Sequence, residues 1–268
     1  MKPRGMGRTW GKTLLSFPGG LVRSALSAGY SWRSGMSKPP ESLLRSLERV
    51  PASRPATLLV RHAARGPIPA GSMGIEVDLT EEGVRSAEVL GTVLTQRRPG
   101  RLLASPAPRC INTGRAIARG AGWMADVDTD ARLSGMGCFF VDGPSAWASF
   151  AAHGVRGTVR RQLSEDAPLP GLHPTATGVT AFMELIVSSR APAKAEAEAA
   201  GPTLDVLVTH DVILAVLVGH FLKIPPDKAN WPEFLEGLVI WPSTAGVVLV
   251  WRGEAIEIPW DAVGSAAR

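Results

Sequence analysis

Two short apolar runs, each ending beside a histidine, most constrain how this chain can fold. The segment "TLLVRHAARGP" (57–67) predicts a buried strand that opens into a loop. The segment "LDVLVT" (204–209) predicts a second buried strand, which ends at His210. A helical pattern comes after each, and such alternation is typical of an α/β fold with a mostly parallel sheet. Polar residues at these strand ends should meet at one edge of the sheet, where ligand crevices form.

The remaining patterns extend this fold over most of the chain. Thr80 is a good N-cap for a long amphipathic helix, with Glu81 and Glu82 at its positive end. The predicted helices are 41–49, 79–98, 107–122, 176–190 and 211–223, and the further strands are 101–105, 236–241, 246–252 and 255–259. The segment 131–175 is rich in Gly and Pro and predicts loops with a short helix or two. We expect a three-layer α/β/α sandwich with a mostly parallel central sheet and antiparallel C-terminal strands.

The charge of the chain is unevenly distributed. Of the 29 Lys and Arg residues, seven lie within 1–40, which contains no acid, so 41–268 holds 22 basic and 24 acidic residues. This slight acidic excess gives little support for binding nucleic acid or an anionic membrane. We expect a basic, disordered extension over 1–50 and a folded domain over 51–268. For the first 40 residues an organelle transit peptide, a disordered tail and a true start at Met36 are all open.

The two cysteines and the hydropathy pattern bear on the class and location of the protein. Cys110 and Cys138 match no zinc or Cys-x-x-Cys spacing, so we expect both to be small buried side chains. There is no run of about 18 apolar residues, which argues against a transmembrane helix. Sparse cysteine use suits a reducing compartment. We expect a cytoplasmic protein, with organelle targeting by the N-terminal segment as the alternative.

Six polar residues stand at the predicted strand ends and can meet at the same edge of the sheet. The first strand supplies three, the helix after the second strand supplies one, and the strand at 204–209 supplies two. They are Arg61, His62 and Arg65, then Arg109, then His210 and Asp211. The planar N–H forks of arginine match phosphate oxygens. Three guanidiniums beside two imidazoles therefore indicate a site for a phosphoryl group.

Four segments place these residues in a recognisable order. They are "VRHAARGP", "LTEEGVRSAEVLG", "ASPAPRCINTGRAIA" and "VTHDVIL". In this order they resemble the histidine phosphatase superfamily, which includes the cofactor-dependent phosphoglycerate mutases. The resemblance covers roughly residues 57–250 and is faint in 131–200. It implies a phosphoglycerate mutase-like fold and makes 51–268 the catalytic domain.

The resemblance also implies roles for the residues of the first motif and its partners. His62 would be the nucleophile that takes the phosphoryl group. The groups that would hold the phosphoryl oxygens are Arg61, Arg65, Arg109 and His210. The first motif departs from the usual Arg-His-Gly, because position 63 is Ala, a small residue also seen in relatives.

The proton donor is the second departure. Asp211 resembles the donor of the acid phosphatase and phytase branch, whose second motif is His-Asp. The mutase-like branch instead uses a glutamate in the middle of the chain. No Glu lies between Glu88 and Glu165 in this sequence, so Asp211 is the better candidate.

We therefore expect a phosphomonoester hydrolase that forms a phosphohistidine at His62 and needs no cofactor. A metal would require carboxylate clusters that these motifs lack. The partner would be a small phosphorylated substrate or a phosphoprotein, and the oligomeric state is open. One alternative is a mutase or phosphotransferase, against which the missing glutamate counts. The other is a non-catalytic module that binds a phosphorylated ligand, and such a module need not keep a nucleophile.

A few further residues admit both a functional and a packing interpretation. Trp231 and Phe234 could line a substrate pocket, but we expect them to pack in the core. Arg160 and Arg161 could receive a remote acidic group of the substrate, but we expect a surface pair. The remaining histidines are His153, His173 and His220, and we expect them to be structural or exposed.

Overall fold

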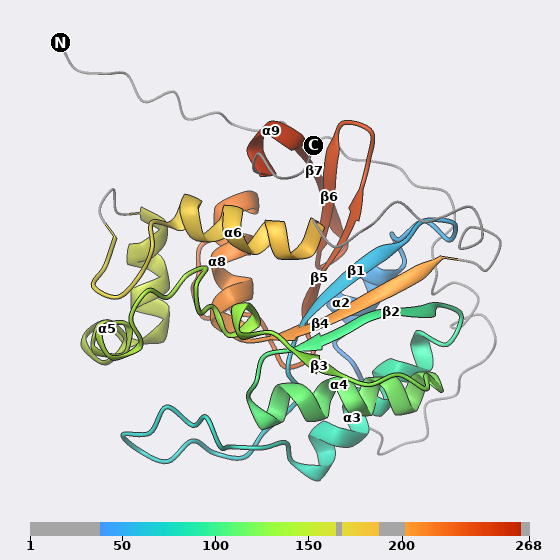
Figure 1. Cartoon of the computed structure of the whole chain (residues 1–268), viewed down its shortest axis with the longest axis horizontal. Helices are drawn as coiled ribbons and strands as arrows, with labels where there is room; N and C mark the ends of the chain where they lie inside the picture. Colours follow the sequence, from blue (N-terminus) through green and yellow to red (C-terminus); the bar gives the residue numbers. More distant parts are fainter. Residues whose placement is uncertain (1–37, 165–167, 188–201, 264–268) are drawn as a thin grey trace.

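The fold is a seven-stranded sheet covered by helices on both faces (Figure 1). It was obtained as a computed structural model, in which residues 38–164, 168–187 and 202–263 are described. The strands are β1 (Ala56–Arg61), β2 (Arg98–Ala104), β3 (Asp128–Thr129), β4 (Thr203–Thr209), β5 (Gly237–Pro242), β6 (Gly246–Trp251) and β7 (Glu254–Pro259). Their order across the sheet is β3-β2-β4-β1-β5-β6-β7.

The direction of the strands matches the expectation from the sequence. β3, β2, β4 and β1 pair in parallel, and the last three strands add to β1 by antiparallel pairing. β1 and β4 are fully buried apart from Thr203 at the start of β4, as expected for strands that are covered on both faces. In Figure 1 both run from right to left, so their carboxyl ends lie at the same edge.

Two groups of helices cover the two faces of the sheet (Figure 1). The helical elements are α2 (Glu41–Leu47), α3 (Glu81–Val93), α4 (Pro108–Ala121), η1 (Ala131–Ser134), α5 (Gly143–Ser164), α6 (Thr175–Val187), α8 (Asp211–Leu222) and α9 (Trp260–Val263). α2, α3 and α4 pack on the face that carries Leu58 and Val60, whereas α6 and α8 pack on the face that carries Leu59. This alternation along β1 divides the interior into two cores. The expected three-layer sandwich is confirmed.

The folded part of the chain begins before residue 51, where the sequence suggested a boundary. In α2, Leu43 and Leu47 are completely buried and belong to the same core as α3 and α4. Ser42 also donates a hydrogen bond of 2.7 Å to the Glu236 carboxylate. Residues 41–50 therefore belong with the domain and not with an extension. Residues 1–37, for which targeting was considered, lie outside the described residues.

One predicted helix and one segment predicted to be mostly loop differ from the observed structure. The helix predicted over 79–98 begins as expected, since Thr80 accepts a hydrogen bond from the Gly83 N–H, but it ends at Val93. It stops because Arg97 turns inward and donates to the carbonyl oxygens of Pro51 and Arg54, and β2 starts at the next residue. The segment 131–175 holds more helix than expected. α5 alone spans 22 residues, in two helical parts joined at Gly154.

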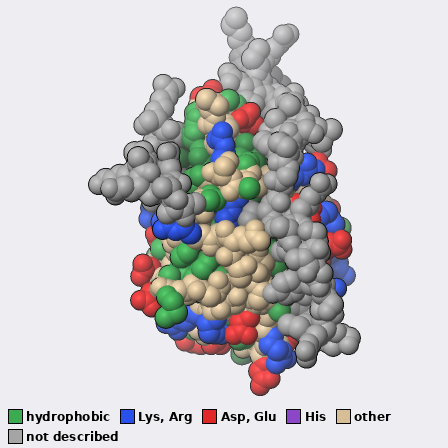
Figure 2. Space-filling view, turned by 90° about the vertical axis from the view of Figure 1, so that its right-hand side faces the viewer, with side chains coloured by type: hydrophobic (Ala, Val, Ile, Leu, Met, Phe, Trp, Pro, Cys, Tyr) green, Lys and Arg blue, Asp and Glu red, His purple; other side chains and the backbone are tan. Residues whose placement is uncertain are grey.

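The side of the molecule where the parallel strands begin is seen in Figure 2. Acidic and basic side chains are mixed along its edges, and no broad patch of one charge is visible among the coloured atoms. None of the helices in the described part of the chain combines the length and the apolar character needed to cross a bilayer.

α3 and α4 approach each other closely because each has a glycine at the contact. A Cβ atom at Gly120 would overlap the carbonyl oxygen of Glu88, and one at Gly91 would overlap the carbonyl oxygen of Ile117. Both obstacles are backbone atoms, which cannot move without shifting a whole helix. This contact holds α4, whose first turn carries Arg109, against the α3 layer.

We predict that Gly120→Ala lowers the free energy of unfolding by about 1–3 kcal/mol, because the added methyl group forces the helices apart. Denaturant unfolding followed by circular dichroism measures the change. Gly143→Ala is the matched control, since a Cβ at Gly143 meets no atom within 4 Å. An equally stable Gly120→Ala protein would show that the two helices are not in tight contact.

Candidate active site

The pairing of β1 with β4 brings the two strand-end histidines together. The register aligns Arg61 with Thr209, and the His62 N–H donates to the Thr209 carbonyl oxygen at 3.0 Å. The rings of His62 and His210 consequently lie with their centroids 5.6 Å apart at an interplanar angle of 69°. Two residues that are 148 positions apart in sequence thus face one small volume at the edge of the sheet.

The His62 ring is held with one nitrogen available. Its Nδ1 lies 2.8 Å from the carbonyl oxygen of Ala63, so the neutral ring donates through Nδ1–H and keeps a lone pair on Nε2. Only 3% of the residue is exposed. Burial, followed by the nearby His210 and the charges of Arg61 and Arg109, lowers the pKa of His62 to about 2. The direction agrees with a neutral nucleophile, but burial contributes more than the cations.

Arg61 lies beside His62 and is held on several sides. Its guanidinium forms an ion pair of 2.9 Å with Asp211 and donates to the Pro232 carbonyl oxygen at 2.7 Å. The ring of Phe234 lies under it, 4.2 Å from the guanidinium carbon to the ring centroid. The remaining group, Nε, is buried without a hydrogen-bond partner among the described residues. An oxyanion could satisfy such a donor.

Arg109 approaches the histidines from the first turn of α4. Its Nη1 donates to the carbonyl oxygens of Gly74 (2.6 Å) and Ile75 (3.2 Å), which ties the loop after β1 to the site. Its Nη2 lies 3.5 Å from His210 Nδ1. The Nε of Arg109, like that of Arg61, is buried and has no partner in the described part of the chain. Both guanidiniums therefore retain unused N–H groups.

His210 is oriented by contacts at both ring nitrogens. Besides the contact with Arg109, its Nε2 lies 2.8 Å from the Ser105 hydroxyl. Burial and then the Arg109 charge lower its pKa to about 4. The ring is therefore neutral near pH 7. A dianion placed among these groups would favour protonation of His210 and so add a donor.

Arg65 lies at the margin of this cluster. Its Nη1 donates to the neighbouring Gly66 carbonyl oxygen at 2.7 Å. Burial lowers the pKa of Arg61 most, and the positive charge of Arg65 acts in the same direction. Burial and then Arg65 also contribute to the lowered pKa of Arg109, while the Cys110 and Asp211 charges oppose it. The structure thus gathers the six residues that were selected from the sequence, with Arg65 as the peripheral member.

Asp211 is more strongly engaged than the sequence suggested. One carboxylate oxygen pairs with Arg61 and also accepts a hydrogen bond of 3.1 Å from the indole N–H of Trp231. The other accepts from the Val212 N–H at the start of α8. Both oxygens of the carboxylate therefore have donor partners already. Any role as a proton donor requires that these contacts change when a ligand enters.

The expectation that Trp231 and Phe234 pack in the core is met in part: Trp231 packs against the core on the α6 and α8 side, but both residues also contact the site. Trp231 binds Asp211, and Phe234 contacts both Arg61 and the His62 ring, whose centroid is 5.7 Å from that of Phe234. Both side chains are only partly buried. They lie on an irregular segment without periodicity, so no sequence pattern distinguishes core packing from contact with a site.

A buried ion pair, also not foreseen, anchors this segment. Glu236 is 2% exposed and accepts hydrogen bonds from Arg252 at 2.8 and 3.0 Å and from Ser42. Arg252 donates in addition to the carbonyl oxygens of Ala229 and Trp231. The pair thereby fixes the chain around 229–236, which supplies Pro232 and Phe234 to Arg61.

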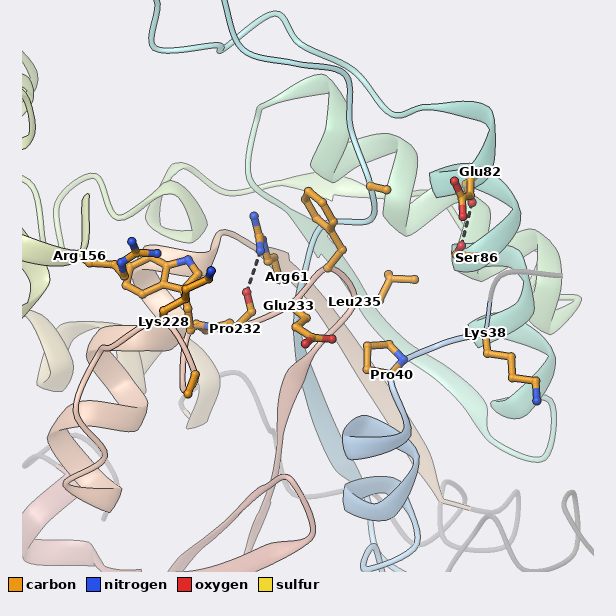
Figure 3. A pocket seen from close by; sticks show the side chains of 14 residues that line it. Lys38, Pro40, Arg61, Glu82, Ser86, Arg156, Lys228, Pro232, Glu233 and Leu235 are labelled. Carbon is orange, nitrogen blue, oxygen red and sulfur yellow. Dashed lines mark hydrogen bonds between the residues drawn. The ribbon is translucent and has the colours of Figure 1, made fainter. Parts of the chain in front are cut away.

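Two cavities open beside the cluster. The first, of about 570 Å³, is seen in Figure 3, with Arg61 near its centre and the hydrogen bond to Pro232 dashed. The second, of about 550 Å³, reaches Asp211. Trp231 and Arg156 line both. Neither His62 nor His210 lines either of these two cavities.

The two cysteines and the possible metal ligands were the other reactive groups considered in the sequence. Cys110 and Cys138 are buried free thiols, as predicted, and burial raises the pKa of Cys110 to about 12. The Cys110 sulfur packs 3.7 Å from His210 Nε2. No cluster of three or more His, Cys, Asp or Glu side chains suited to a metal ion occurs among residues 38–164, 168–187 and 202–263.

The sequence matches one family model. The model of the histidine phosphatase superfamily (branch 1) matches residues 57–240. No curated protein sequence matches the chain. The His210–Asp211 pair resembles the acid phosphatase branch, so a match to branch 1 does not by itself give Asp211 its role.

Several solved structures are similar in fold. Mycobacterial glucosyl-3-phosphoglycerate phosphatase with inorganic phosphate is 20% identical, with 80% of this chain and 99% of that chain covered and a TM-score of 0.48. Bacillus stearothermophilus YhfR is 17% identical (74% and 96% covered, TM-score 0.49). Phosphoglycerate mutase from Bacillus anthracis is 15% identical (78% and 95% covered, TM-score 0.45).

The buried His62 predicts a pH dependence of stability. In the unfolded chain His62 takes up a proton below about pH 6.5, whereas the folded protein keeps it neutral down to a pKa of about 2. The stability linked to His62 is therefore fully present above pH 6.5 and is lost as the pH falls. We expect His62→Gln to reduce the slope of unfolding free energy against pH by about 1.4 kcal/mol per pH unit between roughly pH 4 and 6. Guanidinium unfolding at several pH values measures this, and an unchanged slope would mean that His62 is not buried in its neutral form.

Proposed function

Because the chain belongs to the histidine phosphatase superfamily, we propose that it hydrolyses phosphomonoesters through a phosphohistidine at His62. One observation carries the proposal. The buried imidazole has Nδ1 bound to Ala63 and Nε2 unbonded among the described residues, and Arg61 and Arg109 beside it each keep a buried N–H without a partner. A tetrahedral anion fits this combination of a neutral nucleophile and unsatisfied cationic donors.

The proposed reaction has two steps. In the first, the Nε2 lone pair of His62 attacks phosphorus, the N–P bond forms, and the bond from phosphorus to the ester oxygen breaks. The departing alkoxide takes a proton from the general acid, for which Asp211 is proposed below. In the second, a water molecule attacks phosphorus, the N–P bond breaks, and the proton lost by the water returns to the acid. Free phosphate leaves and His62 is neutral again.

The cations serve the transferring group in both steps. Arg61, Arg109 and protonated His210 would donate to its equatorial oxygens, where charge gathers in the transition state. The Nε groups of the two arginines are available for this without breaking any existing contact. Arg65, at the margin, would add positive charge.

Asp211 is the proposed proton donor, and its ion pair sets a condition on that role. Its carboxylate already accepts from Arg61 and Trp231. A phosphate dianion would draw Arg61 toward its own oxygens and so release the carboxyl group from this ion pair. Turnover should therefore be favoured with leaving groups that need little protonation.

The experiment that tests this function is incubation with p-nitrophenyl phosphate. The reaction is then quenched, and the protein is analysed for a covalently bound phosphoryl group that acid removes. We expect release of free phosphate and an acid-labile phosphoenzyme, both of which disappear in His62→Ala. His173→Ala, which removes a histidine away from the cluster, is the control. Transfer to an acceptor without net hydrolysis would indicate a mutase instead. Phosphate-ester binding with no turnover would indicate a binding module.

A second prediction concerns Asp211. We expect Asp211→Asn to lower kcat/KM for ethyl phosphate by roughly 10²–10⁴-fold, because an alkoxide needs a proton to leave. The loss with p-nitrophenyl phosphate should be much smaller, since p-nitrophenolate leaves unprotonated. Asp205→Asn is the control for loss of an ion pair, as Asp205 pairs with Arg101 and is not part of the site. Equal losses for both esters would mean that Asp211 acts by orienting Arg61 and not as an acid.

A further inference from the structure

We propose that the substrate carries a second anionic group, a carboxylate or a second phosphate, which Arg156, Arg160 and Lys228 bind beside Trp231. This inference rests on the proposed function for the identity of the first group, the phosphoryl ester. It adds a subsite that selects among esters. The subsite is distinct from the His62 cluster, because its three cations come from α5 and from the loop after α8.

The two cavities connect this subsite to the reaction centre. Arg156 and Trp231 line both of them. Arg61 lines the first and Asp211 lines the second, and these two residues contact each other at 2.9 Å. In Figure 3, Arg156 and Lys228 lie together at one end of the first cavity, with Arg61 between them and the far end. A ligand held at Arg61 can therefore extend past Trp231 to the exposed cations.

The three cations have no counter-charge of their own. In the described part of the chain none of them takes part in an ion pair. Arg156 and Arg160 stand four residues apart in the second helical part of α5, so they occupy the same face of that helix and repel each other. An anion between them would remove this repulsion.

The acidic residues that line the cavities either lie away from Arg156 and Lys228 or are already paired with another cation. Asp211 is neutralised by Arg61. Figure 3 shows Glu82 at the other end of the first cavity, on the side of Lys38, and the Glu233 carboxylate directed toward Pro40. The end that holds Arg156 and Lys228 is therefore positive.

The shape of α5 explains why the sequence alone did not identify this set. Gly154 adopts φ 66° and ψ 162°, which breaks the helix just before Arg156 and turns the second part toward the cavity. Arg160 and Arg161 were expected to form a surface pair. The structure separates them: Arg160 lines the second cavity, while Arg161 lines neither.

The chemistry of the cations sets the class of ligand. Arginine forks bind the paired oxygens of carboxylate or phosphate, and lysine adds a point charge. Cavities of this size hold small molecules. We therefore expect a compact organic phosphate with a second acidic group.

The test measures binding to the wild-type chain, so that it does not depend on turnover. The probes are simple alkylphosphonates and compounds of equal length that carry a carboxylate or a second phosphonate at the other end. The spacers run from two to six carbons, and binding is measured by calorimetric titration. We expect the second acid to tighten binding about 10-fold at the best spacer length, an advantage that salt reduces. Arg156→Ala/Arg160→Ala should abolish this advantage and leave binding of the simple alkylphosphonate unchanged. Arg161→Ala, one residue away on the same helix, should behave as wild type.

The outcomes separate the two proposals. No advantage from the second acid at any spacer length, or an advantage that survives in the double variant, overturns the subsite. Hydrolysis of simple and doubly acidic esters at equal kcat/KM also overturns the subsite, but it leaves the phosphatase proposal intact. The binding advantage without hydrolysis of any ester supports the subsite and overturns the phosphatase proposal.

Discussion

The parallel pairing of β1 with β4 is the constraint on which the rest of the site depends. These strands lie at the centre of the sheet, and their register ends with Arg61 opposite Thr209. The residues that follow, His62 and His210, are thereby brought within ring contact. A slip of one residue would exchange the side chains between the two faces of the sheet, expose one core and separate the histidines. Because both faces are packed, the cores fix the register, and the register positions the imidazoles.

Sequence patterns predicted the elements that have strong local signals. The strands at β1 and β4, the N-cap at Thr80 and the six residues at the strand ends all follow from apolar periodicity and from the rule that ligands bind at the carboxyl ends of parallel strands. The parts that escaped prediction have no periodicity. Trp231 reaches Asp211 only because a loop between α8 and β5 folds back over the sheet edge. Contacts of this kind depend on the whole fold and leave no mark in a short window of sequence.

The loop around 229–236 also explains why the fold keeps a buried carboxylate far from the reacting atoms. Burying Glu236 is unfavourable unless it is fully paired, and Arg252 and Ser42 together supply that pairing. The result is a rigid junction between α2, β6 and the loop. Through Pro232 and Phe234 this junction restrains the guanidinium of Arg61. α2 thus contributes to the site although none of its residues lies in the cluster.

Burial is the largest influence on the protonation state of His62. Desolvation lowers its pKa most, and His210, Arg61 and Arg109 add to the effect. The buried Nε groups of Arg61 and Arg109 have no partner among the described residues, which is consistent with their use in binding an incoming anion. In the proposed mechanism Asp211 is the critical residue, because it would pair with Arg61 before a ligand arrives and would protonate the leaving group afterwards. A substrate with a second acid held at Arg156 and Arg160 would bring its phosphoryl group to Arg61 already oriented, and the exchange of partners at Asp211 would follow from binding itself.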